Sequence, residues 1–411
     1  NMLYKKLIDQ LLNSWFLICL LMLLFTLSIS VIFHNSDTSL FIFFLNIFFI
    51  LIYFYNTKTI LSLDKFSFKS ILINISLISF QTLFFLKIFF FINSGDYFEF
   101  SAKDSIQYDF FAKEMHDLGL NDFLYNYFYA GFSYEDLGAI FSVYLSYYIY
   151  PSTVIFNLVN IFANLISCYS LYKLLKYYSN KEIATYCSLF YGLSSFILYL
   201  NSTGMKEIIF VMFVILFFEK FNSFIIEPRY YKLISPILLL LSVLFFRPAV
   251  LIMIILSILL AIIYSSDRKN FIINYISFAF IFLLIILFYN DIVFILQRHY
   301  ANEYAIAERS GLQANTFNLL SSLMSGFMGP FPTYHPILSN AQQSFYSIGI
   351  TFRILLTTPF LFGAYCIIKK RNIILLSILF FTIIEMLALS LIYESFELRL
   401  NSPHLIFVYF I

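Results

Sequence analysis

Apolar segments long enough to cross a lipid bilayer recur along almost the whole chain. A transmembrane helix needs about 20 predominantly apolar residues, and the 411-residue sequence offers about eleven such runs. They cover residues 15–33, 39–56, 70–92, 152–172, 183–200, 208–226, 233–246, 249–264, 271–289, 346–368 and 373–392. A last run begins at about 405, and we expect it to be a span truncated at Ile411. The pattern predicts an all-α, polytopic helical bundle of about 11–12 transmembrane helices, forming a single integral membrane domain over residues 1–411.

The composition supports this class. Only 12% of the residues are charged, about half the share in a typical soluble protein, so a soluble fold would lack the charges to cover its surface. The net charge of +2 gives no basic surface for nucleic acid. The four cysteines lie within apolar segments at no metal-ligand spacing, which favours buried thiols.

Basic residues alternate between successive loops. One set of loops holds sixteen of the 25 Lys and Arg residues: Lys5, Lys6, Lys58, Lys65, Lys69, Lys173, Lys176, Lys181, Lys220, Arg229, Lys232, Arg268, Lys269, Lys369, Lys370 and Arg371. The positive-inside rule places these loops in the cytoplasm. We therefore expect a multi-pass protein of the bacterial inner membrane with a cytoplasmic N-terminus.

Two outer loops are long, at about 94–151 and 290–345. Long loops are uncommon unless they are functional, so the outer face is the expected location of the site. Within the first loop, helical spacing over 104–117 predicts a surface helix. Residues 137–150 are apolar but too short to span, and we expect a half-helix whose tyrosines contact sugar rings or lipid at the outer surface.

No nucleotide-binding, zinc-protease or serine-hydrolase motif is present. The charged residues of the outer loops are therefore the remaining candidates for catalytic groups. The first loop is rich in carboxylates, of which Asp96 and Asp104 follow soon after the preceding span. A carboxylate there can take a proton from a sugar hydroxyl. Most of the other acids in this loop are interpreted as solvated surface residues.

Several cations lie at the outer edge of the predicted spans. Lys206 lies between two predicted spans, and Arg247 lies at the tip of a short hairpin. Because the hairpin is short, we expect Arg247 to lie within the membrane, where a cation needs a partner or a ligand. Arg298, His335 and Arg399 belong to the same side. Arginine binds phosphate bidentately, so these residues are candidates for holding a lipid-linked phosphate. Lys87 and Arg353 lie within spans and are expected to reach the surface with their long side chains, whereas Glu385 is expected to be paired.

Five short motifs occur in order along residues 70–411: Asp104-Ser-Ile-Gln-Tyr108, Gly204-Met-Lys-Glu207, Arg247-Pro248, Gly329-Pro-Phe-Pro332 and Glu397-Leu-Arg399 with Pro403. This set resembles bacterial membrane proteins of surface-polysaccharide synthesis, namely the GT-C-like glycosyltransferases and the O-antigen or capsule polymerases related to them. Three spans precede the acidic loop here, where the simplest GT-C pattern has one, which favours a polymerase over a transferase of single sugars.

The resemblance implies a polymerase that joins undecaprenyl-pyrophosphate-linked oligosaccharide repeat units at the periplasmic face. Asp104 or Asp96 would be the catalytic base, and Lys206, Arg247, Arg399 and Arg298 would bind phosphate. Tyr108, Glu207, His335 and Glu397 would contact other parts of the substrate. No metal or cofactor is expected; membrane lipid and a chain-length regulator are expected partners, and nucleic acid is not.

Two alternatives remain open from the sequence. A GT-C enzyme that transfers one sugar from a polyprenyl-phosphate donor would use the same groups. A flippase for the same lipid-linked oligosaccharide would belong to a different class, although the sequence shows no internal repeat of the kind that transporters often carry.

Overall fold

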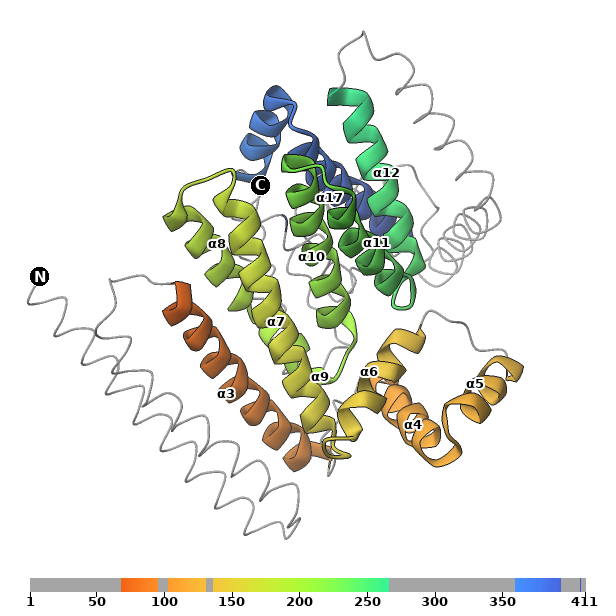
Figure 1. Cartoon of the computed structure of the whole chain (residues 1–411). Coiled ribbons are helices and arrows are strands. Elements are labelled where there is room, and N and C mark those ends of the chain that lie inside the picture. The colour runs from red at the N-terminus through yellow and green to blue at the C-terminus, as the bar shows by residue number, and fades with distance from the viewer. Residues whose placement is uncertain (1–67, 95–102, 131–135, 266–358, 393–406, 408–411) are drawn as a thin grey trace, which may run out of the picture.

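The computed structural model describes residues 68–94, 103–130, 136–265 and 359–392, together with Phe407. Helices and short turns form this part of the chain, which contains no strand (Figure 1). The long and short helices are α3 (Phe68–Ser94), α4 (Lys103–Leu118), α5 (Leu120–Tyr129), α6 (Leu137–Tyr147), α7 (Thr153–Lys176), α8 (Lys181–Gly192), α9 (Ser195–Thr203), α10 (Glu207–Ile226), α11 (Tyr230–Leu244), α12 (Pro248–Ser265) and α17 (Ile373–Ile392), with a further helix over 359–370. The predicted all-α class is therefore confirmed for the described residues.

Three of these helices, α7, α10 and α12, are long and apolar enough to cross a membrane. A fourth span exists if α8 and α9 are counted together. The sequence predicted one continuous run over 183–200, whereas the structure breaks it between Gly192 and Ser195, and the two axes differ by 48°. Ser194 accounts for the restart, since its hydroxyl accepts a hydrogen bond from Ile197 N at 3.4 Å as an N-cap.

The predicted surface helix over 104–117 is present as α4. The expected half-helix is α6, whose 11 residues extend roughly 16 Å, well short of the hydrocarbon core of a bilayer. The predicted spans over 15–33, 39–56 and 271–289, the second long loop and the run after 405 apart from Phe407 lie outside the described residues.

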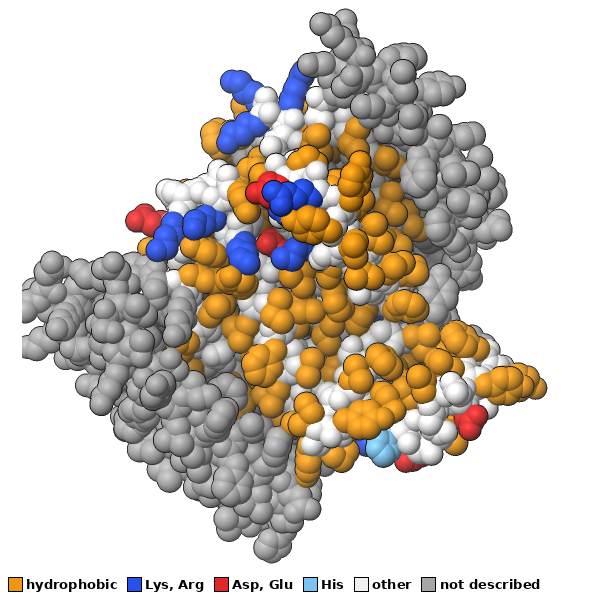
Figure 2. Space-filling model, viewed as in Figure 1, with side chains coloured by type: hydrophobic (Ala, Val, Ile, Leu, Met, Phe, Trp, Pro, Cys, Tyr) orange, Lys and Arg blue, Asp and Glu red, His pale blue; other side chains and the backbone are white. Residues whose placement is uncertain are grey.

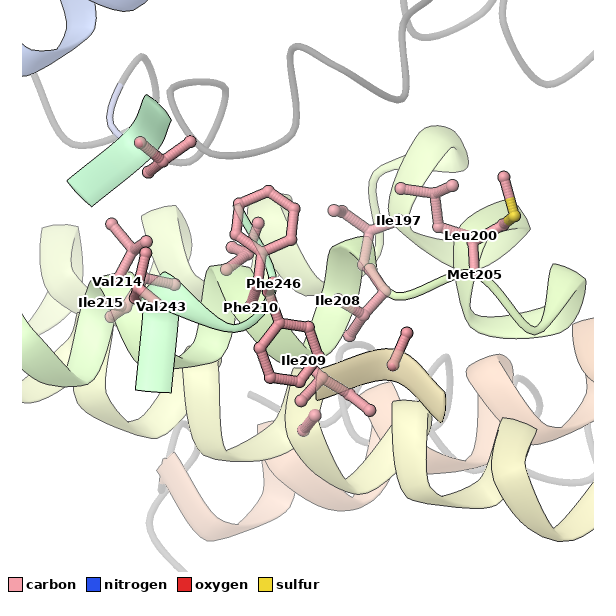
Figure 3. Close-up of a cluster of buried hydrophobic side chains, with 14 of the residues drawn as sticks. Ile197, Leu200, Met205, Ile208, Ile209, Phe210, Val214, Ile215, Val243 and Phe246 are labelled. Atoms are coloured by element: carbon pink, nitrogen blue, oxygen red, sulfur yellow. The ribbon is translucent and has the colours of Figure 1, made fainter. Parts of the chain in front are cut away.

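The packing centre lies between α7 and α10. Phe210, Val214 and Phe218 on α10 are fully buried, and Val243 and Phe246 from the α11–α12 hairpin lie beside this helix (Figure 3). The contacts bring the hairpin tip close to the first turn of α10. The fold therefore places Arg247, at the hairpin tip, next to Glu207 in the first turn of α10.

The two ends of the helices differ in charge. Lys173 and Lys176 lie in the last turn of α7 and Lys181 opens α8, while Arg371 lies over the Tyr264 ring at the end of α12, 5.8 Å from its centroid. Figure 2 shows Lys and Arg side chains gathered at the end where α7 finishes and α8 begins. The α4–α6 unit lies at the opposite end (Figure 1). The helices thus bring together the basic loops that the sequence assigned to one side.

Candidate functional site

The turn between α9 and α10 carries two of the predicted site residues. Gly204 ends α9 in the left-handed conformation at φ 73°, which glycine adopts without steric cost, and α10 begins three residues later. The turn is buried throughout, and Lys206 and Glu207 are only 8% and 2% exposed. Two charged side chains are therefore held inside the molecule, where each needs an ionic or polar partner.

Asparagines on α7 hold this turn in place. The Asn157 amide donates to the Asn201 carbonyl at 3.0 Å, and the Asn160 amide donates to the Met205 carbonyl at 3.1 Å. Asn164, one turn further on, donates to the Gly192 carbonyl at 3.3 Å. The carbonyls of Asn201 and Gly192 belong to helix ends that leave them open, and Met205 lies in the turn itself. These three asparagines, the asparagine stripe, therefore fix both breaks in the helical path.

Lys206 forms an ion pair with Asp136, the residue that precedes α6. The Lys206 ammonium forms an ion pair with Asp136 Oδ1, and the Tyr108 hydroxyl donates to the same oxygen at 3.1 Å. The pKa of Tyr108 is raised far above its usual range, mainly by burial and then by the charges of Asp136, Glu207 and Asp104. Tyr108 is therefore a neutral hydrogen-bond donor at any physiological pH.

Arg247 faces the other carboxylate of the turn. Its Nη2 lies 3.8 Å from Glu207 Oε1, and its guanidinium carbon lies 5.3 Å from the centroid of the Phe210 ring, within cation–π distance. Glu207 Oε2 is buried without a hydrogen-bond partner among the described residues. The ion pair is thus loose, and Arg247 keeps donors available for another acceptor.

The N-terminal turn of α6 is docked against the hairpin tip. Gly138 N donates to the Phe245 carbonyl at 2.9 Å, and a Cβ at Gly138 would lie 2.6 Å from the Phe246 ring. Only glycine permits this approach. The contact brings Asp136 and Arg247 to the same end of the helices, although they are far apart in the sequence.

The structure therefore brings four predicted site residues into one cluster: Tyr108, Lys206, Glu207 and Arg247. Asp104 lies one helical turn before Tyr108 on α4 and acts on it electrostatically. The prediction that Arg247 requires a partner is met by Glu207. The remaining candidates lie outside the described residues: Asp96, Arg298, His335, Glu397 and Arg399.

Some residues of the cluster were not predicted as site residues. Asp136 was interpreted as a solvated acid but accepts from both Lys206 and Tyr108. The asparagine stripe was overlooked, although polar residues at helical spacing within an apolar run are a visible signal.

The expectation for Lys87 was wrong. This residue was expected to reach the surface, but it is 2% exposed because it is enclosed between helices. Glu385 is also 2% exposed, and Arg353 lies outside the described residues.

The cluster combines two cations, Lys206 and Arg247, with three carboxylates, Asp104, Asp136 and Glu207. Each cation is compensated by a carboxylate, so a phosphate that binds here must replace a carboxylate or arrive with further cations. Among the described residues, no three His, Cys, Asp or Glu side chains gather as potential metal ligands. The donors and acceptors present suit a ligand with both anionic and hydroxyl groups.

No family model, curated protein or solved structure matches this chain.

Proposed function

We propose that this protein is a membrane glycosyltransferase that joins polyprenyl-pyrophosphate-linked oligosaccharide repeat units, in O-antigen or capsule synthesis. The observation that carries the proposal is the convergence of Tyr108, Lys206, Glu207 and Arg247 at the end of the helices opposite the Lys- and Arg-rich end. If the basic end faces the cytoplasm, this cluster lies at the outer leaflet of the bacterial inner membrane. A lipid-linked substrate presents its phosphates at that depth.

The proposed roles follow from charge and exposure. The side chain of Arg247 is 22% exposed and its ion pair is loose, so it is the residue best placed to exchange Glu207 for a phosphate oxygen. Lys206 would add a second charge on release from Asp136. Breaking the bond between sugar and phosphate puts negative charge on the leaving group, and cations placed there stabilise the transition state more than the ground state.

Two roles rest on the sequence. Asp104, or Asp96, would act as the base that takes the proton of the acceptor hydroxyl. The described cluster contains more carboxylates than cations, and so a pyrophosphate requires the additional charges of Arg399 and Arg298. The full proposal includes about 11–12 spans with an N-terminus in the cytoplasm.

The test is the replacement of Arg247 by Ala in cells whose only copy of the protein carries the change. We expect long polysaccharide to disappear from a gel while single repeat units remain, because phosphate binding is lost. Arg247→Lys should retain a shortened ladder, since a lysine keeps the charge but not the bidentate contact. Arg229→Ala, at the opposite end of the helices, is the matched control and should leave the ladder intact. A normal ladder at a normal level of Arg247→Ala protein would exclude Arg247 from the site.

A flippase for the same lipid-linked oligosaccharide is a second candidate, and the break between α8 and α9 favours it. Discontinuous helices are common at transporter binding sites. Deletion of the gene distinguishes the two functions. Accumulation of single repeat units on the outer leaflet supports the polymerase, whereas accumulation on the inner leaflet supports the flippase.

A further inference from the structure

A polar pocket lies next to this cluster, on the adjacent face of α4, where the helix meets α3, α6, α7 and the α9–α10 turn. Its polar lining includes Lys87, Ser105, Asp109, Tyr147 and Thr203. All five residues are at least nine-tenths buried. Phe156 and Val143 contribute apolar surface to the same pocket. Such a concentration of buried polar groups around one pocket is costly unless they have polar partners.

Helix α4 presents a different pair of residues to each site. Asp104 and Tyr108 are four residues apart and belong to the cluster with Lys206 and Asp136. Ser105 and Asp109 have the same spacing, one position further along, and line the pocket. Residues four apart share a helix face, so α4 has two adjacent polar faces. The α9–α10 turn also serves both sites, since Thr203 and Gly204 line the pocket and Lys206 belongs to the cluster.

Asp109 is the central acceptor of the pocket. The Tyr147 hydroxyl donates to its Oδ1, and Lys113 Nζ lies 2.8 Å from its Oδ2. The pKa of Tyr147 is raised well above its usual range by burial and by the hydrogen bond to Asp109, so the phenol remains a donor. A carboxylate offers about four acceptor positions, and Asp109 can therefore accept a further hydroxyl. The tyrosines of 144–150 were expected at the outer surface, but Tyr147 points inward.

The free space is matched to a single oxygen atom. The cavity volume is about 10 Å³, which is about the least that admits one water molecule. A sugar hydroxyl has the same size and the same ability to donate and accept hydrogen bonds. Lys87 supplies donors and Asp109 supplies acceptors. The Thr203 hydroxyl donates to the Leu200 carbonyl at 3.2 Å, so its oxygen is a further acceptor for the ligand. Apolar groups such as Phe156 suit the C–H face of a sugar ring.

We propose that this pocket is a carbohydrate subsite that takes one hydroxyl group of a sugar ring, with the ring at the open side of the pocket. The choice of a carbohydrate as ligand rests on the proposed function. The arrangement separates two tasks on the two faces of α4: the cluster with Arg247 faces the phosphate, and the pocket with Lys87 and Asp109 orients the sugar.

The test measures binding directly, without an activity assay. In a variant of the full chain whose four cysteines are replaced by alanine, Ser105→Cys places a thiol in the pocket. The rate of its reaction with a small methanethiosulfonate reagent is measured with and without methyl glycosides of hexoses, N-acetylhexosamines and 6-deoxyhexoses. The matched control is Ser146→Cys on α6, because Ser105 and Ser146 are both 3% exposed and Ser146 does not line the pocket.

We expect at least one glycoside to slow the labelling of Ser105→Cys severalfold and to leave Ser146→Cys unchanged. Thr203→Val should abolish this protection, whereas Thr185→Val, at another buried threonine outside the pocket, should not. If Ser105→Cys reacts at the same rate with every glycoside, the pocket holds only water and the proposal is wrong.

The binding result and the polymer assay are independent. Protection of Ser105→Cys, together with long polysaccharide in cells from which the gene has been deleted, would support the subsite and count against the polymerase. Loss of polymer in Arg247→Ala without any protection would support the polymerase and overturn the subsite.

Discussion

Asp136 joins two residues of the candidate site, although the sequence did not single it out. It pairs with Lys206 and accepts from Tyr108, although its own side chain is 41% exposed while that of Lys206 is only 10% exposed. Removal of its charge leaves an almost buried ammonium without compensation. Breaking a fully buried pair costs about 3–5 kcal/mol, and the partial exposure of Asp136 reduces this value because solvent screens the charge.

We therefore expect Asp136→Asn to lower the free energy of unfolding by about 1–2 kcal/mol. Thermal or denaturant unfolding of the purified protein in detergent measures the change. Lys113→Met is a suitable control, because the Lys113 side chain is 58% exposed in its pair with Asp109, and the expected loss is below about 1 kcal/mol. In the double variant Asp136→Asn with Lys206→Met, the two losses should not add. Simple additivity would show that the two residues do not interact.

The sequence identified individual site residues unevenly, for a physical reason. Lys206 and Arg247 were found because a cation between or within apolar runs is conspicuous and costly. Asp136 was not found, because it is one of nine acids in the first outer loop and nothing beside it marks it. Its partner lies 70 positions away, and pairing over that separation is decided by helix packing, which local patterns do not encode.

At the scale of elements, the contact between α6 and the hairpin tip controls the position of Arg247. A methyl group at Gly138 would lie 2.6 Å from the Phe246 ring and 2.9 Å from the Phe245 carbonyl oxygen. The carbonyl belongs to the backbone, so relief of this contact requires the hairpin to move. Overpacking of this kind costs about 1–3 kcal/mol.

Gly138→Ala is therefore expected to destabilise the protein and, by displacing Arg247, to shorten the polysaccharide ladder. Gly119→Ala provides the comparison: Gly119 has φ 82°, and a methyl group there would meet no atom within 4 Å. Its replacement strains the backbone, which costs about 1–2 kcal/mol, but leaves the hairpin undisturbed. Unfolding curves together with ladder lengths separate the two effects. A normal ladder from Gly138→Ala protein would show that the position of α6 does not govern Arg247.

Element boundaries were predicted best where apolar runs end in clear polar signals. The α11–α12 hairpin was expected because Arg247-Pro248 interrupts two apolar runs, and α12 begins at Pro248. The break between α8 and α9 was not expected, because the run over 183–200 contains no charged residue and no proline, although Gly192, Ser194 and Ser195 interrupt its apolar residues. Its causes are a serine N-cap and the Asn164 contact to Gly192. The first is a weak local signal and the second depends on tertiary packing.

At the scale of the whole molecule, the separation of charge between the two ends predicts which end faces the cytoplasm. The basic end includes Lys176 at the end of α7, and Asp117 lies on α4 in the unit at the opposite end. A transmembrane α7 places the two residues on opposite sides of the membrane. Both are exposed, so a cysteine at either position is accessible to a reagent on its own side.

We expect a membrane-impermeant maleimide to label Asp117→Cys in intact spheroplasts of the cysteine-free variant. Lys176→Cys should be labelled only after the membrane is permeabilised, because the positive-inside rule places that end in the cytoplasm. Labelling after permeabilisation is the control for reactivity at both positions. The reverse pattern would invert the topology and place the Arg247 cluster in the cytoplasm, where a periplasmic polymerase is excluded. Equal labelling of both positions in intact spheroplasts would show that α7 does not separate the two ends.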